Sequence, residues 1–392
     1  MLEVELVNTD AGFRQLEDEW RELVCRCPDV PYFLTWEFVA TRWKYFSTDR
    51  ELWILTARDD DAKLVGLAPW AIARTSLGPF KLRRLEFLCR AEHPAAFFPS
   101  DGENLDFISL PGHKDAVALI FLRHLISSRK NWDVVDLGWL APHSSLPTGL
   151  RKAGFRLFEQ SSTSYLTTIP DDWATYERTV LGKKQTKNRK YYARRLERDY
   201  PGQVEYHLID KRNEVGPAMD NLIEMNRRRW SSVGQPTPFG DERFVRFHRE
   251  FAESVFDSGW LRFYQLRVGD HILAANCGIV RNDTYDSFQK GFDPNWEMYR
   301  PGRLLQAYEL QQAIEEGSRV YDWAHGAKQS KVDWIDATRE DSHVIAPNSW
   351  KGTLYLGTAA GLPAGKAIGR RVLPQPVYQW IKRAVVRMKG GD

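Results

Sequence analysis

The sequence predicts an α/β (α+β) fold built from two similar modules, each a mixed, mostly antiparallel sheet flanked by helices. Stretches with a period of two alternate with amphipathic helical stretches along most of the chain. The order strand, turn, strand, helix, strand occurs twice, about 190–210 residues apart, which indicates an internal duplication. A length of 392 residues also favours two domains. We expect one module at residues 1–160, a second at 161–345 and a basic tail at 346–392.

The first module opens with a strand and then a helix that Thr9 or Asp10 can cap. Apolar patterning predicts strands at 4–8, 51–58, 62–74, 82–89, 104–110 and 132–140. Apolar residues at helical spacing predict helices at 10–25, 35–46, 114–128 and 147–153. The acidic turn Asp59-Asp60-Asp61 joins two of these strands into a hairpin.

The second module repeats this order, with its hairpin turn at Gly269-Asp270. Strands are predicted at 161–168, 261–268, 272–280, 284–290 and 319–323, and helices at 183–198, 214–230, 243–256 and 302–316. Only this copy has a dense polar segment after its last strand, from His325 to Lys331. Ligands of open α/β sheets bind beyond strand ends, so we expect the chemistry here and a non-catalytic first module.

Composition and charge narrow the class of protein. A net charge of +3 implies no global attraction to nucleic acid. The acidic N-terminal residues do not resemble a signal peptide, no apolar run is long enough to span a bilayer, and four scattered cysteines fit reduced thiols. We therefore expect a cytoplasmic protein. Its basic tail is either a solvated helix or a segment lying on the anionic inner face of the membrane.

A cationic stripe is predicted on the helix at 183–198. Its members recur at helical spacing and share one face: Lys183, Lys187, Lys190, Arg194 and Arg198. Tyr192 and Leu196 lie opposite and would dock the helix. The stripe is either a solvated face or a contact for phosphates of a cofactor, a phosphorylated substrate or RNA. No RNA-binding signature accompanies it, so nucleic acid is the weaker choice.

The helix predicted at 302–316 begins with Arg300-Pro301-Gly302-Arg303-Leu304. A glycine lets a ligand approach the backbone closely, and the free N–H groups at a helix start attract anions. Arg300 and Arg303 add positive charge. This stretch is either a short diphosphate cradle or an ordinary turn into a helix.

Reactive side chains crowd the end of the strand at 319–323. His325 can act as a general base near neutral pH, and Asp322 would fix its tautomer. Lys331 would hold a phosphate or carboxylate, and Lys328 belongs to the same group. The alternative is that Asp322 caps a turn and His325 has no chemical role.

Other motifs are either ambiguous or missing. Arg229-Trp230 either neutralise the carbonyl end of a helix or line the substrate cleft. No metal-ligand spacing, P-loop, dinucleotide fingerprint or nucleophile elbow occurs in the sequence, so we expect no metal and no covalent intermediate.

The order of several stretches resembles the GNAT-superfamily acyltransferases of the CelD/BcsL type, associated with cellulose biosynthesis, and more distantly the two-module Fem peptidyltransferases. The matching stretches are Lys183 to Arg198, Arg229-Trp230 with Gly234, Gly291-Phe292-Asp293-Pro294, Arg300-Pro301-Gly302, Ala313 to Gly317, and Tyr321-Asp322-Trp323 with Gly326 and Lys331. They cover most of residues 160–340. The GNAT pyrophosphate loop Arg/Gln-x-x-Gly-x-Gly/Ala is not present.

The resemblance implies two GNAT-like modules and transfer of an acyl group, most often acetyl, from acyl-CoA. The implied acceptor is an amine or hydroxyl of a small molecule, sugar, polysaccharide or envelope precursor. The donor would lie at Arg300, Gly302, Arg303 and Leu304, and the other substrate contacts would come from Lys328, Lys331, Arg229, Trp230, Lys187 and Arg194.

From the residues themselves we expect His325 as the base, oriented by Asp322, and backbone N–H groups of the strand at 271–280 facing the thioester carbonyl. Two alternatives remain open: aminoacyl transfer from charged tRNA, as in the Fem proteins, and a binding module that has kept the fold without catalysis.

Overall fold

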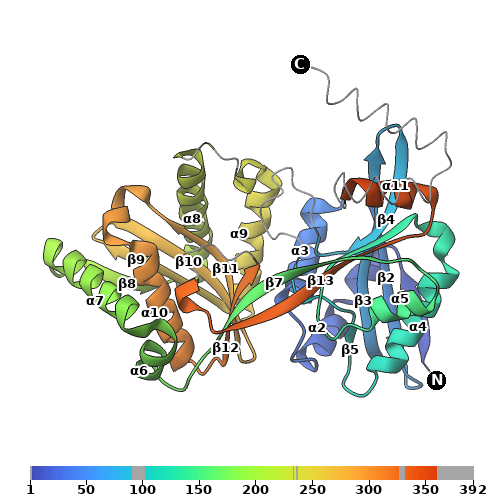
Figure 1. The fold of residues 1–392 in the computed structure, drawn as a ribbon, viewed down its shortest axis with the longest axis horizontal. Coiled ribbons are helices and arrows are strands. Elements are labelled where there is room, and N and C mark those ends of the chain that lie inside the picture. Colours follow the sequence, from blue (N-terminus) through green and yellow to red (C-terminus); the bar gives the residue numbers. More distant parts are fainter. Residues whose placement is uncertain (1, 91–101, 233, 235–236, 326–331, 360–392) are drawn as a thin grey trace.

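A single mixed sheet runs through the whole molecule (Figure 1). The computed structural model describes residues 2–90, 102–232, 234, 237–325 and 332–359. Twelve strands follow one path across the sheet, in the order β1-β2-β3-β4-β6-β13-β7-β12-β11-β10-β9-β8, and β5 pairs with β3 off this path. The predicted α/β fold with a mostly antiparallel sheet is confirmed.

The N-terminal half of the sheet carries five helices. Its strands are β1 (Glu3–Val7), β2 (Arg50–Arg58), β3 (Leu64–Leu77), β4 (Phe80–Phe87), β5 (Ile108–Ser109) and β6 (Val134–Leu140). Its helices are α1 (Asp10–Gln15), α2 (Glu17–Cys25), α3 (Trp36–Phe46), α4 (Lys114–Ser127) and α5 (Leu146–Lys152). The strand predicted at 104–110 shrinks to β5, because Leu105 only bridges Leu140.

The second half repeats the arrangement. Its strands are β7 (Phe158–Thr168), β8 (Val204–Leu208), β9 (Leu261–Val268), β10 (His271–Arg281), β11 (Thr284–Phe292), β12 (Val320–His325) and β13 (Ala337–Pro347). Its helices are α6 (Trp173–Tyr176), α7 (Gly182–Asp199), α8 (Arg212–Ser232), α9 (Glu242–Asp257), α10 (Pro301–Glu315) and α11 (Trp350–Ala359). The predicted strands and helices of this half lie within a few residues of the observed ones, and β8, β13, α6 and α11 are additional.

Both halves are built around one parallel strand pair. Strand β4 is parallel to β6, and β11 is parallel to β12, whereas the other paired strands are antiparallel. A helix precedes the second strand of each pair, α4 before β6 and α10 before β12. The internal duplication inferred from the sequence therefore has a structural counterpart.

The C-terminal end of the described chain returns to the N-terminal half. Strand β13 lies between β6 and β7, and α11 packs against β4 and β6. The boundary predicted at residue 345 thus falls inside β13. Its sequence, with Arg339, Glu340 and Asp341, lacks the apolar alternation of an ordinary strand because its polar side chains join buried ion-pair clusters.

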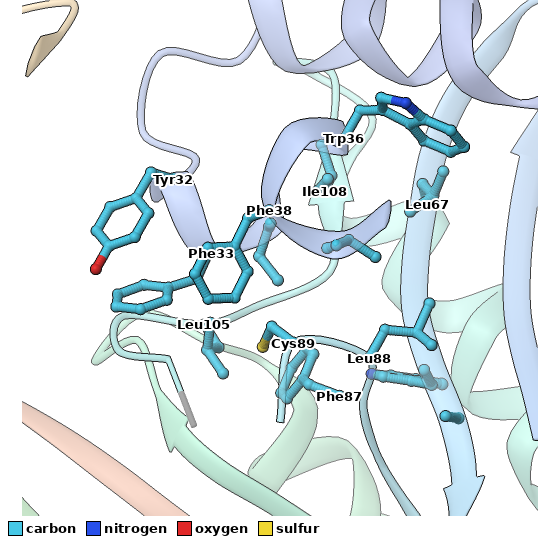
Figure 2. Packing of buried hydrophobic residues seen from close by; sticks show 14 of the residues in the cluster. Tyr32, Phe33, Trp36, Phe38, Leu67, Phe87, Leu88, Cys89, Leu105 and Ile108 are labelled. Atoms are coloured by element: carbon cyan, nitrogen blue, oxygen red, sulfur yellow. The ribbon is translucent and has the colours of Figure 1, made fainter. Parts of the chain in front are cut away.

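The two halves share one hydrophobic core, part of which Figure 2 shows. Helix α3 packs against α9. At this contact the buried Arg42 guanidinium lies 4.0 Å from the ring centre of Phe247 and 4.9 Å from that of Phe38. A shared core fixes the position of one module against the other. Among the described helices, none is both long and apolar enough to cross a bilayer.

Candidate active site

Strands β11 and β12 separate after a short parallel contact. They pair only at Thr284↔Val320, Tyr285↔Tyr321 and Asp286↔Asp322, whereas β11 continues alongside β10 as far as Phe292. Beyond Asp286, no strand among the described residues pairs with the edge of β11 that faces β12, so its backbone groups can bind a ligand. We call this gap the open edge.

The backbone donors predicted for the strand at 271–280 lie elsewhere. Strand β10 pairs with β9 on one side and β11 on the other over most of its length, which engages its N–H groups in the sheet. That prediction is wrong, because the parting of strands falls at β11 and β12.

A basic groove lies between α7 and the start of α10. Its volume is about 390 Å³. It is lined by Lys184, Gln185, Asn188, Arg189, Tyr192, Arg300, Arg303, Leu304 and Trp334. The Arg303 guanidinium is held 2.9 Å from Gln185 Oε1 and 3.0 Å from Asp333 Oδ2. The groove thus combines three arginines, one lysine and a helix start, which suits an anionic ligand.

The structure brings Arg300, Arg303 and Leu304 together, as the sequence predicts. Arg300 adopts the left-handed conformation (φ 52°) at the start of α10, and no side chain caps the helix. Gly302 occupies the first turn, where an added Cβ would meet only the Phe292 ring at 3.5 Å. Packing alone therefore does not require glycine at this position, and Gly302 is not among the residues that line the basic groove.

The cationic stripe of α7 faces away from this groove. Lys187 and Arg194 are exposed, whereas Gln185, Arg189 and Tyr192 face the protein. Leu196 is fully buried, so the predicted docking face is confirmed. Lys190 pairs with Glu177 and Arg198 with Asp199.

A second cavity lies between the modules, on the face of the sheet opposite α10. We call it the inter-module cavity, and its volume is about 470 Å³. Strands β11 and β12 contribute Asp286 and Asp322, and the N-terminal module contributes the loop 28–33. The open edge therefore lies between a basic groove and an acidic cavity.

Asp286 is the distinctive group of this cavity. Within the described chain no hydrogen bond or ion pair reaches its carboxyl group. Burial raises its pKa well above the usual range, and the charge of Asp322 raises it further, while Arg281 and Arg339 act in the opposite direction. Asp286 is thus a proton-binding group aimed at a space large enough for a substrate.

On the α10 face of the open edge, Lys290 provides a positive charge. Its ammonium group lies 2.6 Å from the Tyr321 hydroxyl and 3.4 Å from Glu309, which is fully buried. It also lies 4.8 Å from the Trp323 ring centre. A cation on one face and carboxyl groups on the other flank the place where the strands separate.

His325 is not oriented by Asp322. Its Nε2 lies 3.1 Å from Asp341 and its Nδ1 3.3 Å from Glu103, whereas Asp322 accepts from Arg339 (2.8 Å) and from the N–H of Ala324. The predicted pairing is therefore wrong. The bulge of β12 next to Ala324, which has φ 62°, turns His325 away from the strand direction.

A single guanidinium balances this carboxylate cluster. Arg339 lies 2.8 Å from Asp341 and 3.8 Å from Glu103. Burial raises the pKa of Glu103, and although burial opposes it, hydrogen bonds from His325 and Arg339 lower that of Asp341. Atoms of Glu103, His325 and Asp341 lie within 4.8 Å of one another, a spacing that could hold a metal ion. Arg339 already supplies positive charge there, so we assign no metal to it.

Of the remaining predicted contacts, the structure describes some and leaves others outside the described residues. The Arg229 guanidinium lies 5.0 Å from the Phe292 ring centre and 5.9 Å from that of Trp230, which places the end of α8 beside the end of β11. Lys328 and Lys331 lie outside the described residues. Sequence reasoning missed Asp286, although a carboxyl group next to the buried Tyr285 in a central strand was a usable signal.

The equivalent position in the N-terminal module is closed by ion pairs. Glu86 and Asp136 follow the last parallel pair of β4 and β6, Leu85↔Val135. Three arginines fill the space beside them, with Arg50 3.0 Å from Glu86, Arg84 2.7 Å from Glu86 and Arg90 3.0 Å from Asp136. In this blocked copy, ion-paired side chains occupy the place that corresponds to the open edge.

Part of the second module matches a known protein family. Residues 183–332 match the family described as acetyltransferase (GNAT) domain. A search of curated protein sequences gave no match.

Solved structures with the same fold include a protein called FemX, with a TM-score of 0.58, 8% identity, and coverage of 84% of this chain and 95% of that one. The C-terminal domain of a putative lysylphosphatidylglycerol synthetase from Agrobacterium fabrum has a TM-score of 0.53 at 12% identity, covering 88% and 96%. A conserved protein of unknown function from Bacteroides thetaiotaomicron reaches 0.50 at 12%, covering 88% and 100%.

The structural likeness shows the shared fold, and residues 183–332, which contain the open edge and the start of α10, are the part of the chain that matches the acetyltransferase (GNAT) domain family.

Proposed function

We propose that the chain is an acyltransferase that uses an acyl thioester, most simply acetyl-CoA. The donor's phosphates bind in the basic groove, its thioester reaches the open edge, and the acceptor enters from the inter-module cavity. The single observation that carries this proposal is the parting of β11 and β12 between a cationic groove and a carboxyl-lined cavity. The GNAT family match supports the reaction type.

The reaction requires a base for the acceptor and donors for the oxyanion. The acceptor nitrogen or oxygen attacks the thioester carbonyl while its proton passes to Asp286. Lys290 and backbone N–H groups at the open edge stabilise the oxyanion that forms. Collapse of the tetrahedral intermediate breaks the carbon–sulfur bond. The released thiolate takes up a proton from solvent, and Asp286 returns to solvent the proton that it accepted, so the site regains its starting state.

Asp286 is a better base than His325 for a geometric reason. Both ring nitrogens of His325 lie next to carboxyl groups, and its side chain is only 9% exposed. Neither nitrogen is free to accept a proton from a substrate. We therefore propose that His325 and Asp322 hold the cavity wall in place through Glu103, Asp341 and Arg339.

We also propose a class of acceptor and a cellular location for the reaction. The resemblance found in the sequence favours an acceptor on a sugar, polysaccharide or envelope precursor, handled in the cytoplasm. The basic residues beyond 360 would allow contact with an anionic membrane surface, and they lie outside the described residues.

Arg303→Ala is expected to weaken acetyl-CoA binding about 10- to 100-fold, because a charge-assisted contact to phosphate is lost. Isothermal titration with acetyl-CoA measures the affinity. The matched control is Arg246→Ala, which removes an exposed arginine of α9 that pairs only with its helix neighbour Glu242. Equal affinities for the wild type and both variants would contradict a donor site in the basic groove.

The exposed cations of α7 suggest a second kind of donor, aminoacyl-tRNA. Lys183, Lys187 and Arg194 are exposed on the face of α7 that points away from the basic groove, and no described residue pairs with them, so aminoacyl-tRNA is an alternative donor. Stabilisation by acetyl-CoA in a melting experiment supports the thioester. Salt-sensitive binding of charged tRNA without that stabilisation supports the alternative. Binding of neither donor would leave a non-catalytic module.

A further inference from the structure

We propose that the N-terminal module completes the acceptor site, and that Tyr32 and its loop bind a hydroxylated acceptor whose reacting group is a primary amine. This inference rests on the proposed acyltransferase function and names its acceptor. It also gives the module with the blocked strand pair a direct part in substrate binding.

The loop that carries Tyr32 is clamped by both modules. Arg281 donates to the carbonyl of Val30 at 2.6 Å, and Asn282 donates to that of Pro28 at 2.8 Å, both from the end of β10. At the other end of the loop, the Trp20 indole donates to the carbonyl of Leu34 at 2.9 Å. A loop tied at both ends presents its side chains in a fixed position.

The ring of Tyr32 is equally well held. It packs against Phe33 and Phe38 of its own module and against Phe251 and Phe288 of the other, with ring centres 3.9–6.1 Å apart. Figure 2 shows Tyr32 at the edge of the labelled residues of the N-terminal core. The residue lines the inter-module cavity although it is only 5% exposed.

The Tyr32 hydroxyl has no hydrogen-bond partner in the described chain. Burial raises its pKa well above the usual value, and the charges of Asp286, Glu103 and Asp322 raise it further. It therefore stays protonated at neutral pH. A fixed, protonated hydroxyl facing a cavity is a donor for an oxygen or nitrogen atom of a bound ligand.

The charge of the cavity selects the class of acceptor. Five carboxyl side chains line it, those of Asp29, Glu103, Asp283, Asp286 and Asp322, against the two guanidinium groups of Arg281 and Arg339. Arg339 is already engaged by Asp322 and Asp341. Asp286 and Glu103 have raised pKa values, and an alkylammonium group bound among these carboxyl groups would favour their ionised forms. A phosphate or carboxylate would instead add negative charge beside acidic groups. Because Asp286 lies among these groups, the amine is brought to the proposed base.

The rest of the lining indicates a hydroxylated scaffold. Neutral polar groups come from Asn104, Asn282, Thr284 and Ser287, and flat apolar surface comes from Pro28, Pro31 and Phe33. Such a mixture can bind hydroxyl groups by hydrogen bonds and C–H groups by packing. A volume near 470 Å³ is enough for an amino sugar or an amine of similar size.

Acetyl transfer from acetyl-CoA to matched pairs of acceptors tests the chemical class. Suitable pairs are D-glucosamine with D-glucose and serinol with glycerol, which differ in an amine against a hydroxyl. Transfer to the amine members with little or none to their partners supports the inference. If acetyl-CoA binds but the hydroxyl members are preferred, or no amine reacts, the inference is wrong and the thioester donor site still stands.

Tyr32→Phe tests the part played by the N-terminal module. The variant keeps the ring and its packing, so it should fold like the wild type. We expect the KM for the reactive amine to rise about 3- to 10-fold, because one hydrogen bond from the Tyr32 hydroxyl to a neutral ligand hydroxyl is lost, with kcat and acetyl-CoA affinity little changed.

The control is Tyr308→Phe, in which a hydroxyl outside both cavities is removed from a tyrosine stacked on Tyr206. An unchanged KM in Tyr32→Phe would overturn the inference. If the wild-type protein does not bind acetyl-CoA, the proposed function itself is wrong.

Discussion

Replacing Asp286 with asparagine is expected to slow acyl transfer by a factor of about 10²–10⁴ while acetyl-CoA still binds. Asparagine has the same shape but cannot take up the proton of the acceptor. The measurement is the rate of thiol release from acetyl-CoA at saturating acceptor, alongside titration of the donor. A variant with full activity would remove Asp286 as the base.

The pH profile gives an independent check on the same residue. Asp286 must be ionised to act as a base, and its raised pKa places the acidic limb of the rate profile above the usual carboxyl range. Its position depends on Asp322 and Glu103, which raise the pKa, and on Arg281 and Arg339, which lower it. Asp286→Asn should lose this limb, and loss of the limb in His325→Gln instead would favour His325.

Asp286→Asn should lower the activity without lowering the stability of the fold. An acid whose pKa is raised by folding binds its proton more tightly in the folded state, so its ionisation destabilises the fold above its unfolded pKa, near 4. Asp286→Asn removes that penalty, and its melting temperature at neutral pH should equal or exceed that of the wild type. A lower melting temperature would show that the carboxyl group also has a structural role.

Asp136→Ala is expected to lower the free energy of unfolding by about 3–5 kcal/mol, because it removes one member of a buried charge cluster. Asp136 is fully buried and contacts Arg90 at 3.0 Å, together with His343 and the Tyr355 hydroxyl. Urea unfolding followed by circular dichroism measures the change. A loss below about 1 kcal/mol, the range of exposed pairs, would contradict the structural role of this cluster.

Two comparisons make this test specific. Glu159→Ala breaks the exposed pair with Arg151 and should cost less than about 1 kcal/mol. The second comparison is pH. Burial opposes ionisation of Asp136, but the charges of Arg90 and His343 outweigh it and hold the pKa of Asp136 below its usual range. The ionised Asp136 therefore adds its full contribution to the free energy of unfolding above the unfolded pKa, near 4, and this contribution falls at lower pH. The difference between the wild type and Asp136→Asn should therefore shrink in acid.

Much of the fold was predictable because its elements carry strong local periodicity. The hairpins at 50–77 and 261–281 and helix α9 have apolar residues at the positions that are buried. Strand β13 escaped prediction because its neighbours determine its structure. Asp341 is fully buried in an ion-pair cluster, so the strand shows polar residues where a pattern search expects apolar ones.

In the candidate site, too, local sequence patterns could be predicted and contacts between distant segments could not. Arg300, Arg303 and Leu304 are close in sequence and follow a strand end, so a local pattern was sufficient to group them. Asp286, Tyr32 and Arg339 come from segments that only the folded sheet brings together. Asp322 and His325 looked like a pair because they are three residues apart, but the bulge of β12 directs them to different partners.

The return of β13 and α11 to the N-terminal half bears on how the chain folds as it is made. On the ribosome, residues 1–160 emerge first, but β6 cannot acquire its neighbour β13, and β4 cannot be covered by α11, until residues 337–359 have left the exit tunnel. Until then the arginines and acids around Asp136 lack His343 and Tyr355. The first half to be synthesised is thus the last to be completed, and nascent chains that stop before β13 should remain protease-sensitive in both halves.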